Sequence, residues 1–110
     1  MRTTWIQNAK DLDIGRIAKG VIFVMDDVSA PTYMSAVTFR NILLESSAPA
    51  VELFIIDYED MDDQILLWNK LKFRLGLNGE VFLIESGKVK SFVNTLKIEG
   101  QNLLRDFLNS

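Results

Sequence analysis

The sequence predicts an α/β fold in three layers, with a mixed central β-sheet flanked by helices on both faces. Two runs rich in apolar residues, 20–25 (GVIFVM) and 51–59 (VELFIIDYE), have the composition of strands that are buried on both faces. A helical pattern follows each run, and strand–helix–strand segments of this length form parallel pairs with right-handed connections. The pair Ser86-Gly87 is a two-residue hairpin signal near the end of the chain.

The N-terminal segment predicts a short strand over residues 3–6 and a weak helix over 8–19. Asn8 is a suitable cap for this helix, because its side chain can accept a hydrogen bond from a backbone N–H of the first turn. We interpret Trp5 as a packing residue of the first strand.

The next helix is expected over residues 29–45, directly after the first buried strand. Ser29 is placed to cap it, and Pro31 falls in the first turn, where a missing N–H is tolerated. The helix ends before a loop that contains Pro49.

The second half of the chain predicts a helix over 60–73, capped by Asp60 or Asp62, then a hairpin over 80–94 and a closing helix over 99–109. The closing helix carries one apolar stripe. This stripe consists of Leu103, Leu104, Phe107 and Leu108.

Composition favours a single domain over residues 1–110, with elements in the order β-α-β-α-β-α-β-β-α. The chain has 110 residues, of which 48% are hydrophobic, enough for one core. Its net charge of -3 argues against direct binding to nucleic acid, which needs clustered Lys and Arg. We recognise no membrane span and no secretion signal in the sequence, so we expect a cytoplasmic protein that does not bind membranes.

Cysteine and histidine are both absent from the sequence. Thiol–disulfide exchange needs a thiolate, and nucleophilic pairs such as Ser-His or Cys-His need an imidazole base. A zinc site would have to consist of carboxylates alone, which is unusual. We therefore expect no metal, no cofactor and no enzymatic activity.

The element order, together with the segment Val28-Ser29-Ala30-Pro31-Thr32, resembles the thioredoxin family over essentially the whole chain. In that family the corresponding strand leads into an aromatic-Cys-Gly-Pro-Cys turn. Pro31 matches the shared proline, while Ser29 and Thr32 stand at the positions of the two cysteines. The closing hairpin and amphipathic helix also match the end of the family's fold.

Two further family positions are changed. The cis-proline that faces the active site falls on Gly79, so we expect a trans peptide bond there. The buried acid that assists proton transfer falls on Phe23. The resemblance therefore implies a redox-inactive protein that serves as an adaptor, a chaperone or a small subunit of a larger assembly.

Two interpretations of the former active-site turn remain open. Ser29 and Pro31 serve only to begin a helix, or the N–H groups of its first turn also bind a partner's carbonyl or carboxylate. The pair Asn78-Gly79 forms a tight turn, or its backbone pairs with an extended peptide. The candidate partner-binding residues are Val28, Ser29, Ala30, Pro31, Thr32, Asn78 and Gly79.

Acidic residues gather after the second buried strand, in the segment DYEDMDD. Counted from Asp57, the segment lacks the calcium-loop Gly at the sixth place and has Trp68 at the twelfth, so helix capping explains most of it. Parallel strands end at one edge of a sheet, which places the segment near Asp26 and Asp27. We predict an acidic rim suited to a basic partner, formed by Asp26, Asp27, Asp57, Glu59 and Asp60.

The helices expected over residues 29–45 and 60–73 carry apolar residues around more of their circumference than packing on one face of a sheet requires. Tyr33, Met34, Phe39, Leu66 and Trp68 are the residues concerned. Either three-layer packing buries most of them, or some form an exposed interface with Tyr33 or Trp68 as anchors.

These observations predict a protein that binds other protein, as an adaptor or as a subunit of a cellular or viral assembly. The sequence leaves its partner and its oligomeric state open. The alternative is an enzyme on the same scaffold, in which Ser29 or Tyr33 holds a thiol-bearing ligand such as glutathione. Such a ligand would need cations, for which the candidates are Arg40, Lys72 and Arg74.

Overall fold

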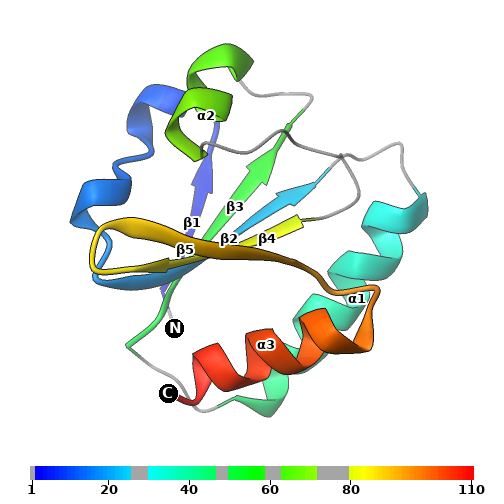
Figure 1. The fold of residues 1–110 in the computed structure, drawn as a ribbon. Helices are drawn as coiled ribbons and strands as arrows, with labels where there is room; N and C mark the ends of the chain where they lie inside the picture. Colours follow the sequence, from blue (N-terminus) through cyan, green and yellow to red (C-terminus); the bar gives the residue numbers. More distant parts are fainter. Residues whose placement is uncertain (1, 26–29, 47–49, 59–62, 72–79) are drawn as a thin grey trace.

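The computed structural model describes residues 2–25, 30–46, 50–58, 63–71 and 80–110 of the chain. Within them, five strands form one mixed sheet in the order β1-β3-β2-β4-β5 (Figure 1). The predicted strands are all present. They are β1 (Arg2–Ile6), β2 (Lys19–Met25), β3 (Glu52–Asp57), β4 (Glu80–Glu85) and β5 (Lys88–Asn94).

Parallel and antiparallel pairing both occur, as the sequence predicts. β3 lies between β1 and β2 and is parallel to both, whereas β4 is antiparallel to β2 and to β5. The three α-helices of the described residues are α1 (Ala30–Glu45), α2 (Gln64–Leu71) and α3 (Ile98–Leu108). α1 and α3 cover one face of the sheet, and α2 covers the other (Figure 1).

The prediction of a single helix over residues 8–19 is wrong. Two short 3₁₀ helices replace it, η1 (Ala9–Asp11) and η2 (Ile14–Arg16). Each is followed by a residue in extended conformation, Leu12 and Ile17, whose side chain is buried in the core beneath α2. The segment does not form one continuous helix, because the extended residues Leu12 and Ile17 place their side chains in the core. The cap prediction is correct, because Asn8 Oδ1 accepts a hydrogen bond of 3.0 Å from Lys10 N.

The β4–β5 hairpin has the predicted two-residue turn. Ser86 and Gly87 have φ angles of 54° and 75°, as the tight turns favoured between antiparallel strands require. The turn also packs against the approach to β2, where Ser86 N donates to Ala18 O at 2.7 Å and Gly87 N to Ile17 O at 2.8 Å.

The cap of α2 is Asp63, one residue after Asp62, the later of the two caps that the sequence predicts. Asp63 Oδ1 accepts a hydrogen bond of 3.0 Å from Leu66 N, and the helix begins at Gln64. Asp60 and Asp62 lie outside the described residues.

The stripe of α3 is narrower than expected. Leu104, Phe107 and Leu108 are buried against α1 and the sheet, but Leu103 is exposed. Successive residues of a helix are separated by about 100°, so Leu103 points away from the face that contains Leu104. Gly100 lies on the buried face one turn earlier.

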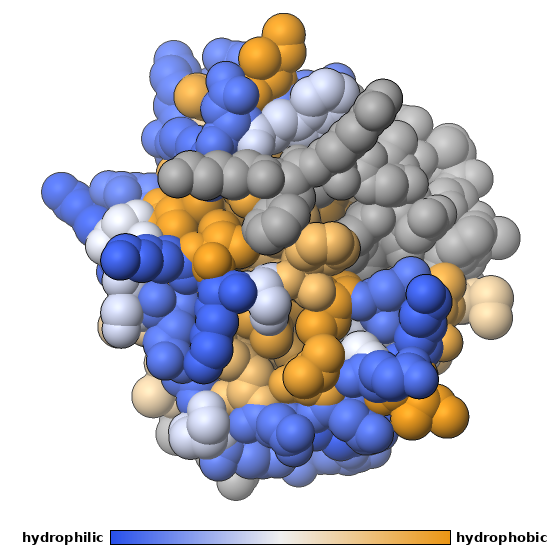
Figure 2. Space-filling view, viewed as in Figure 1, coloured by the Kyte–Doolittle hydropathy of each residue, from blue (hydrophilic) through white to orange (hydrophobic). Residues whose placement is uncertain are grey.

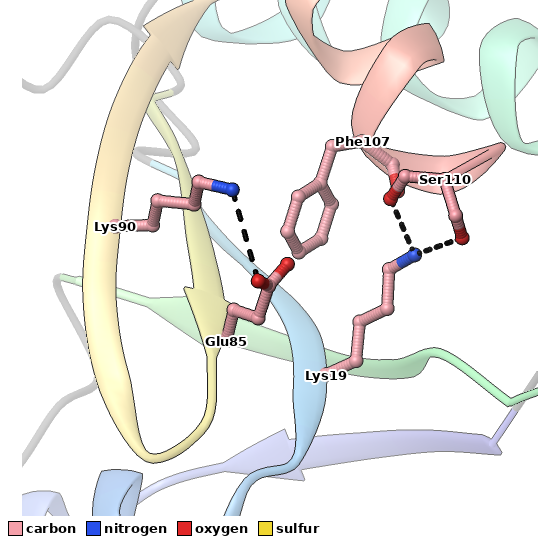
Figure 3. Close-up of polar contacts among 5 residues, drawn as sticks. All are labelled: Lys19, Glu85, Lys90, Phe107 and Ser110. Carbon is pink, nitrogen blue, oxygen red and sulfur yellow. Dashed lines mark hydrogen bonds and ion pairs between the residues drawn. The ribbon is translucent and has the colours of Figure 1, made fainter.

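The C-terminal end of α3 is fixed to the sheet by Lys19 of β2 (Figure 3). Lys19 Nζ donates to the carbonyl oxygen and to Oγ of Ser110, at 2.8 Å each, and lies 5.1 Å from the centroid of the Phe107 ring. Beside it, Lys90 Nζ lies 3.7 Å from Glu85 Oε1 across the hairpin. The Lys19 contacts join the end of α3 to β2, whereas the Lys90–Glu85 pair is exposed and adds little to stability.

Trp5 is not a packing residue, because its side chain is 60% exposed. It lies on β1 opposite Ile55 of β3, at the edge of the sheet. The core on that face takes its residues from the other four strands and from α1 and α3, so β1 lies beyond it.

Candidate functional site

Three of the candidate residues at 28–32 lie at the start of α1, close to where the sequence predicts a helix to begin. Residues 30–32 form the first turn of the helix, which begins at Ala30 and includes Pro31 and Thr32. The remaining candidates for partner binding lie outside the described residues, so their roles stay predictions. These are Val28, Ser29, Asn78 and Gly79.

Of the five residues predicted to form the acidic rim, the structure describes only Asp57. Asp57 closes β3, is partly buried and lies in register with Met25, the last residue of β2. Tyr58 N donates to Met25 O at 2.9 Å, so the two strands end side by side, as expected for parallel neighbours. Asp26, Asp27, Glu59 and Asp60 lie outside the described residues, and the rim as a whole stays a prediction.

Phe23 occupies the position where the thioredoxin family has a buried acid. Its side chain is buried in the middle of β2 and stacks on Phe39 of α1, with ring centroids 4.9 Å apart and planes at 23°. An aromatic pair of this kind contributes packing and offers no proton acceptor. This position belongs to the core of the protein.

The large apolar residues of the middle helices divide between core and surface. Phe39 is buried and Leu66 is partly buried against the core, whereas Met34 is 60% and Trp68 is 39% exposed. The side chain of Tyr33 lies outside the description. Three-layer packing therefore accounts for some of these residues and leaves others at the surface.

Exposed apolar side chains also gather near the start of α1. Leu96 is 38% exposed in the connection between β5 and α3, and Ile98, the first residue of α3, is 70% exposed. A hydrogen bond from Thr95 to Ser35 places this connection beside α1. At the right of Figure 2, hydrophobic atoms project over α1 and over the start of α3, with hydrophilic atoms between them. We call the set Met34, Leu96 and Ile98 the turn-side patch.

Hydrogen bonds hold the turn-side patch in place. Thr95 Oγ1 donates to Ser35 O of α1 at 3.3 Å, and both residues are fully buried. Within the turn, Leu96 N donates to Asn94 Oδ1 at 2.9 Å, and Gln101 Nε2 donates to Thr95 O at 3.0 Å. These bonds join the connection that carries Leu96 to α1 and to α3.

Sequence reasoning missed Leu96 and Ile98. Both are apolar, yet neither belongs to the strand that precedes them or to the stripe of Leu104, Phe107 and Leu108 that follows. An apolar residue that fits no buried pattern is the signal that would have identified them.

A small pocket lies between the C-terminal ends of α1 and α3. It has a volume of about 120 Å³ and is lined by Ile42, Glu45, Ser46, Arg105, Leu108 and Asn109. Arg105 Nε and Glu45 Oε2 lie 3.3 Å apart at its wall. Ligand pockets for molecules of drug size measure about 300 Å³ or more, so this pocket gives the glutathione alternative no support. Arg40 is exposed on α1, while Lys72 and Arg74 lie outside the described residues.

The residues that the structure describes contain no group of three or more Asp and Glu arranged to hold a metal ion. None of the helices among them is long and apolar enough to cross a membrane.

Comparison with solved structures identifies the class of fold. Thioredoxin O2 from Arabidopsis thaliana superposes with a TM-score of 0.74 at 10% identity, covering 98% of this chain and 95% of that one. Malassezia sympodialis thioredoxin gives 0.71 at 14%, covering 99% and 89%, and Trypanosoma brucei brucei thioredoxin gives 0.70 at 14%, covering 97% and 88%. No family model and no curated protein matches the chain by sequence.

The chain therefore has a thioredoxin-like α/β fold, as its sequence predicts. It is a thioredoxin-like protein without cysteine. A mixed disulfide forms only between sulfur atoms, so the hydroxyl groups of this chain do not replace the family's thiols in disulfide exchange.

Proposed function

We propose that this chain is a redox-inactive thioredoxin-like protein that binds another protein, as an adaptor or as a subunit of a larger assembly. The single observation that carries the proposal is the turn-side patch. Met34, Leu96 and Ile98 place apolar surface beside the helix start where the thioredoxin family has its active site. Large apolar side chains that are exposed around one site, with polar atoms between them, are compatible with a protein interface, because whole interfaces are only about as apolar as the rest of a protein surface.

The local structure supports binding rather than packing as the role of these three side chains. The buried Thr95–Ser35 bond joins the turn to α1, so the backbone that carries Leu96 is already positioned before a partner covers the patch. Lys97 is exposed between Leu96 and Ile98 in the chain and adds a positive charge beside these apolar side chains.

Site-specific photo-crosslinking tests the proposal. A photoreactive amino acid is placed at Met34 or Ile98, and the protein is irradiated in its native cells. Leu44 is the matched control, because it is 76% exposed on the same helix at the end remote from the patch.

We expect the same protein to be crosslinked from positions 34 and 98, with about tenfold lower yield from position 44, since crosslinking requires direct contact. Equal yields from all three positions would show nonspecific contact and would overturn the proposal. The absence of any crosslinked protein at positions 34 and 98 would also overturn it.

A further inference from the structure

The outer face of α2 carries a second set of exposed apolar residues. Ile65 is 70% and Trp68 is 39% exposed, one helical turn apart, whereas Leu67 and Leu71 on the inner face are fully buried. At the top of Figure 2, hydrophobic atoms stand out over α2 among hydrophilic ones. Residues three apart on a helix lie side by side, so Ile65 and Trp68 form one continuous surface.

The ring of Trp68 packs against a neighbouring aromatic ring. Its ring stacks on that of Tyr58, with centroids 6.4 Å apart and planes at 7°, and Tyr58 is nearly buried. The backbone of Tyr58 is fixed at both ends, since its N–H donates to Met25 O at 2.9 Å and its carbonyl accepts from Gln64 Nε2 at 2.9 Å. A partly exposed tryptophan that is supported by a second ring is suited to anchor an interface, since tryptophan is enriched among the residues that dominate binding energy.

One exposed carboxylate lies at the start of α2, two residues before Ile65. Asp63 is exposed at the start of α2, where one carboxylate oxygen caps the helix. Lys70 is the only cationic residue within α2, and its Nζ is directed inward to Ala9 O and Leu12 O, at 2.7 Å each. η1, which packs against α2, carries exposed Lys10 and Asp11, whose charges balance.

We propose that Asp63, Ile65 and Trp68 form a docking surface for a protein segment that carries arginine next to aliphatic residues. The aliphatic side chains cover Ile65, and the guanidinium lies over the indole of Trp68 within reach of the Asp63 carboxylate. Arginine suits this surface because its planar group stacks on aromatic rings and also pairs with carboxylates.

This surface goes beyond the proposed function, because it is separate from the turn-side patch. α2 covers the face of the sheet opposite to α1 and α3. Both surfaces are therefore accessible at once, and one chain can connect two proteins.

Peptide display tests the α2 surface. Random peptides are selected on the wild-type protein after depletion on the Trp68→Ala variant, and the enriched sequences are compared with the starting library. Selected peptides are then titrated while the indole N–H resonance of Trp68 is followed by NMR. The Trp5→Phe variant assigns this resonance and is the matched control, since Trp5 is an exposed tryptophan on the β1 edge strand.

We expect enrichment of peptides with arginine beside aliphatic residues, and a shift of the Trp68 resonance on binding. Asp63→Asn retains a capping side chain but removes its charge, so it should weaken binding about threefold, in line with an exposed ion pair. Trp5→Phe should leave the affinity unchanged.

Three results would overturn the inference: no enrichment over the depletion variant, enrichment of acidic peptides, or binding that leaves the Trp68 resonance unmoved. None of them bears on the turn-side patch, which the crosslinking experiment tests at positions 34 and 98. The failure of one proposal is therefore distinguishable from the failure of the other.

Discussion

The hydroxyl of Thr95 donates a hydrogen bond of 3.3 Å to the carbonyl oxygen of Ser35, and neither residue is accessible to solvent. This bond joins the turn after β5 to the second turn of α1, two segments that lie 60 residues apart in the chain. It thereby sets the position of Leu96 relative to Met34.

Replacement of Thr95 by valine should destabilise the protein by about 1 kcal/mol, because the shape is kept while a buried hydrogen bond is lost. Urea unfolding of the purified variant measures this. Thr3→Val, on an exposed residue of β1, is the matched control and should change stability by less than about 0.5 kcal/mol. Equal effects of the two substitutions would show that the buried bond contributes nothing.

Gly100 is required where α3 passes close to the end of β5. A Cβ atom at this position would overlap the backbone of Asn94, which has little freedom to move. We expect Gly100→Ala to lower the free energy of unfolding by about 2 kcal/mol or more. Gly15→Ala is the control, because a Cβ atom there would meet only Asp13 Oδ1, at an ordinary 3.5 Å. Thermal unfolding compares the two variants, and similar melting temperatures would contradict the expectation.

Lys70 connects α2 to the segment that precedes β2. Its ammonium donates to Ala9 O and Leu12 O, so Lys70→Met should destabilise the protein by about 2 kcal/mol, as for hydrogen bonds from a charged group. Amide hydrogen exchange should accelerate at Leu12 and Ile17. Lys90→Met removes only an exposed ion pair and should have little effect. Unchanged exchange at Leu12 in the Lys70 variant would refute the role assigned to this lysine.

Phe23 is a core residue at the position where the resemblance to the thioredoxin family places a buried acid. Restoring an acid there by Phe23→Asp should destabilise the protein by more than about 4 kcal/mol, because a charge would be buried among apolar side chains and the stack on Phe39 would be lost. Phe23→Leu keeps the site apolar and should be better tolerated. Circular dichroism and denaturant titration distinguish these outcomes, and a stable aspartate variant would mean that the site still accommodates an acid.

Most of the fold could be predicted from the sequence, because its strands and helices have strong patterns. The apolar runs of β2 and β3, the Ser86-Gly87 turn and the stripe ending at Phe107 and Leu108 each specify one element. The segment 8–19 could not be predicted in this way. Its helical spacing is overridden by tertiary contacts that bury Leu12 and Ile17, and such contacts are not visible in local sequence.

The surface was harder to predict than the fold. Trp5 and Leu103 have side chains typical of a core, but their exposure depends on where β1 and α3 lie relative to the other layers. The turn-side patch depends on Thr95 meeting Ser35 across a long sequence separation. A local sequence pattern contains no information about a contact between distant segments, so Leu96 and Ile98 could be identified only from the three-dimensional structure.

The central claim is that the turn-side patch binds protein. The direct measurement is the affinity of the crosslinked partner for the Met34→Asp, Ile98→Asp double variant, compared with wild type and with Leu44→Asp. We predict a loss of about 100-fold for the double variant, as for truncation at an interface centre, and less than about twofold for Leu44→Asp. An unchanged affinity of the double variant, or an equal loss with Leu44→Asp, would contradict the account.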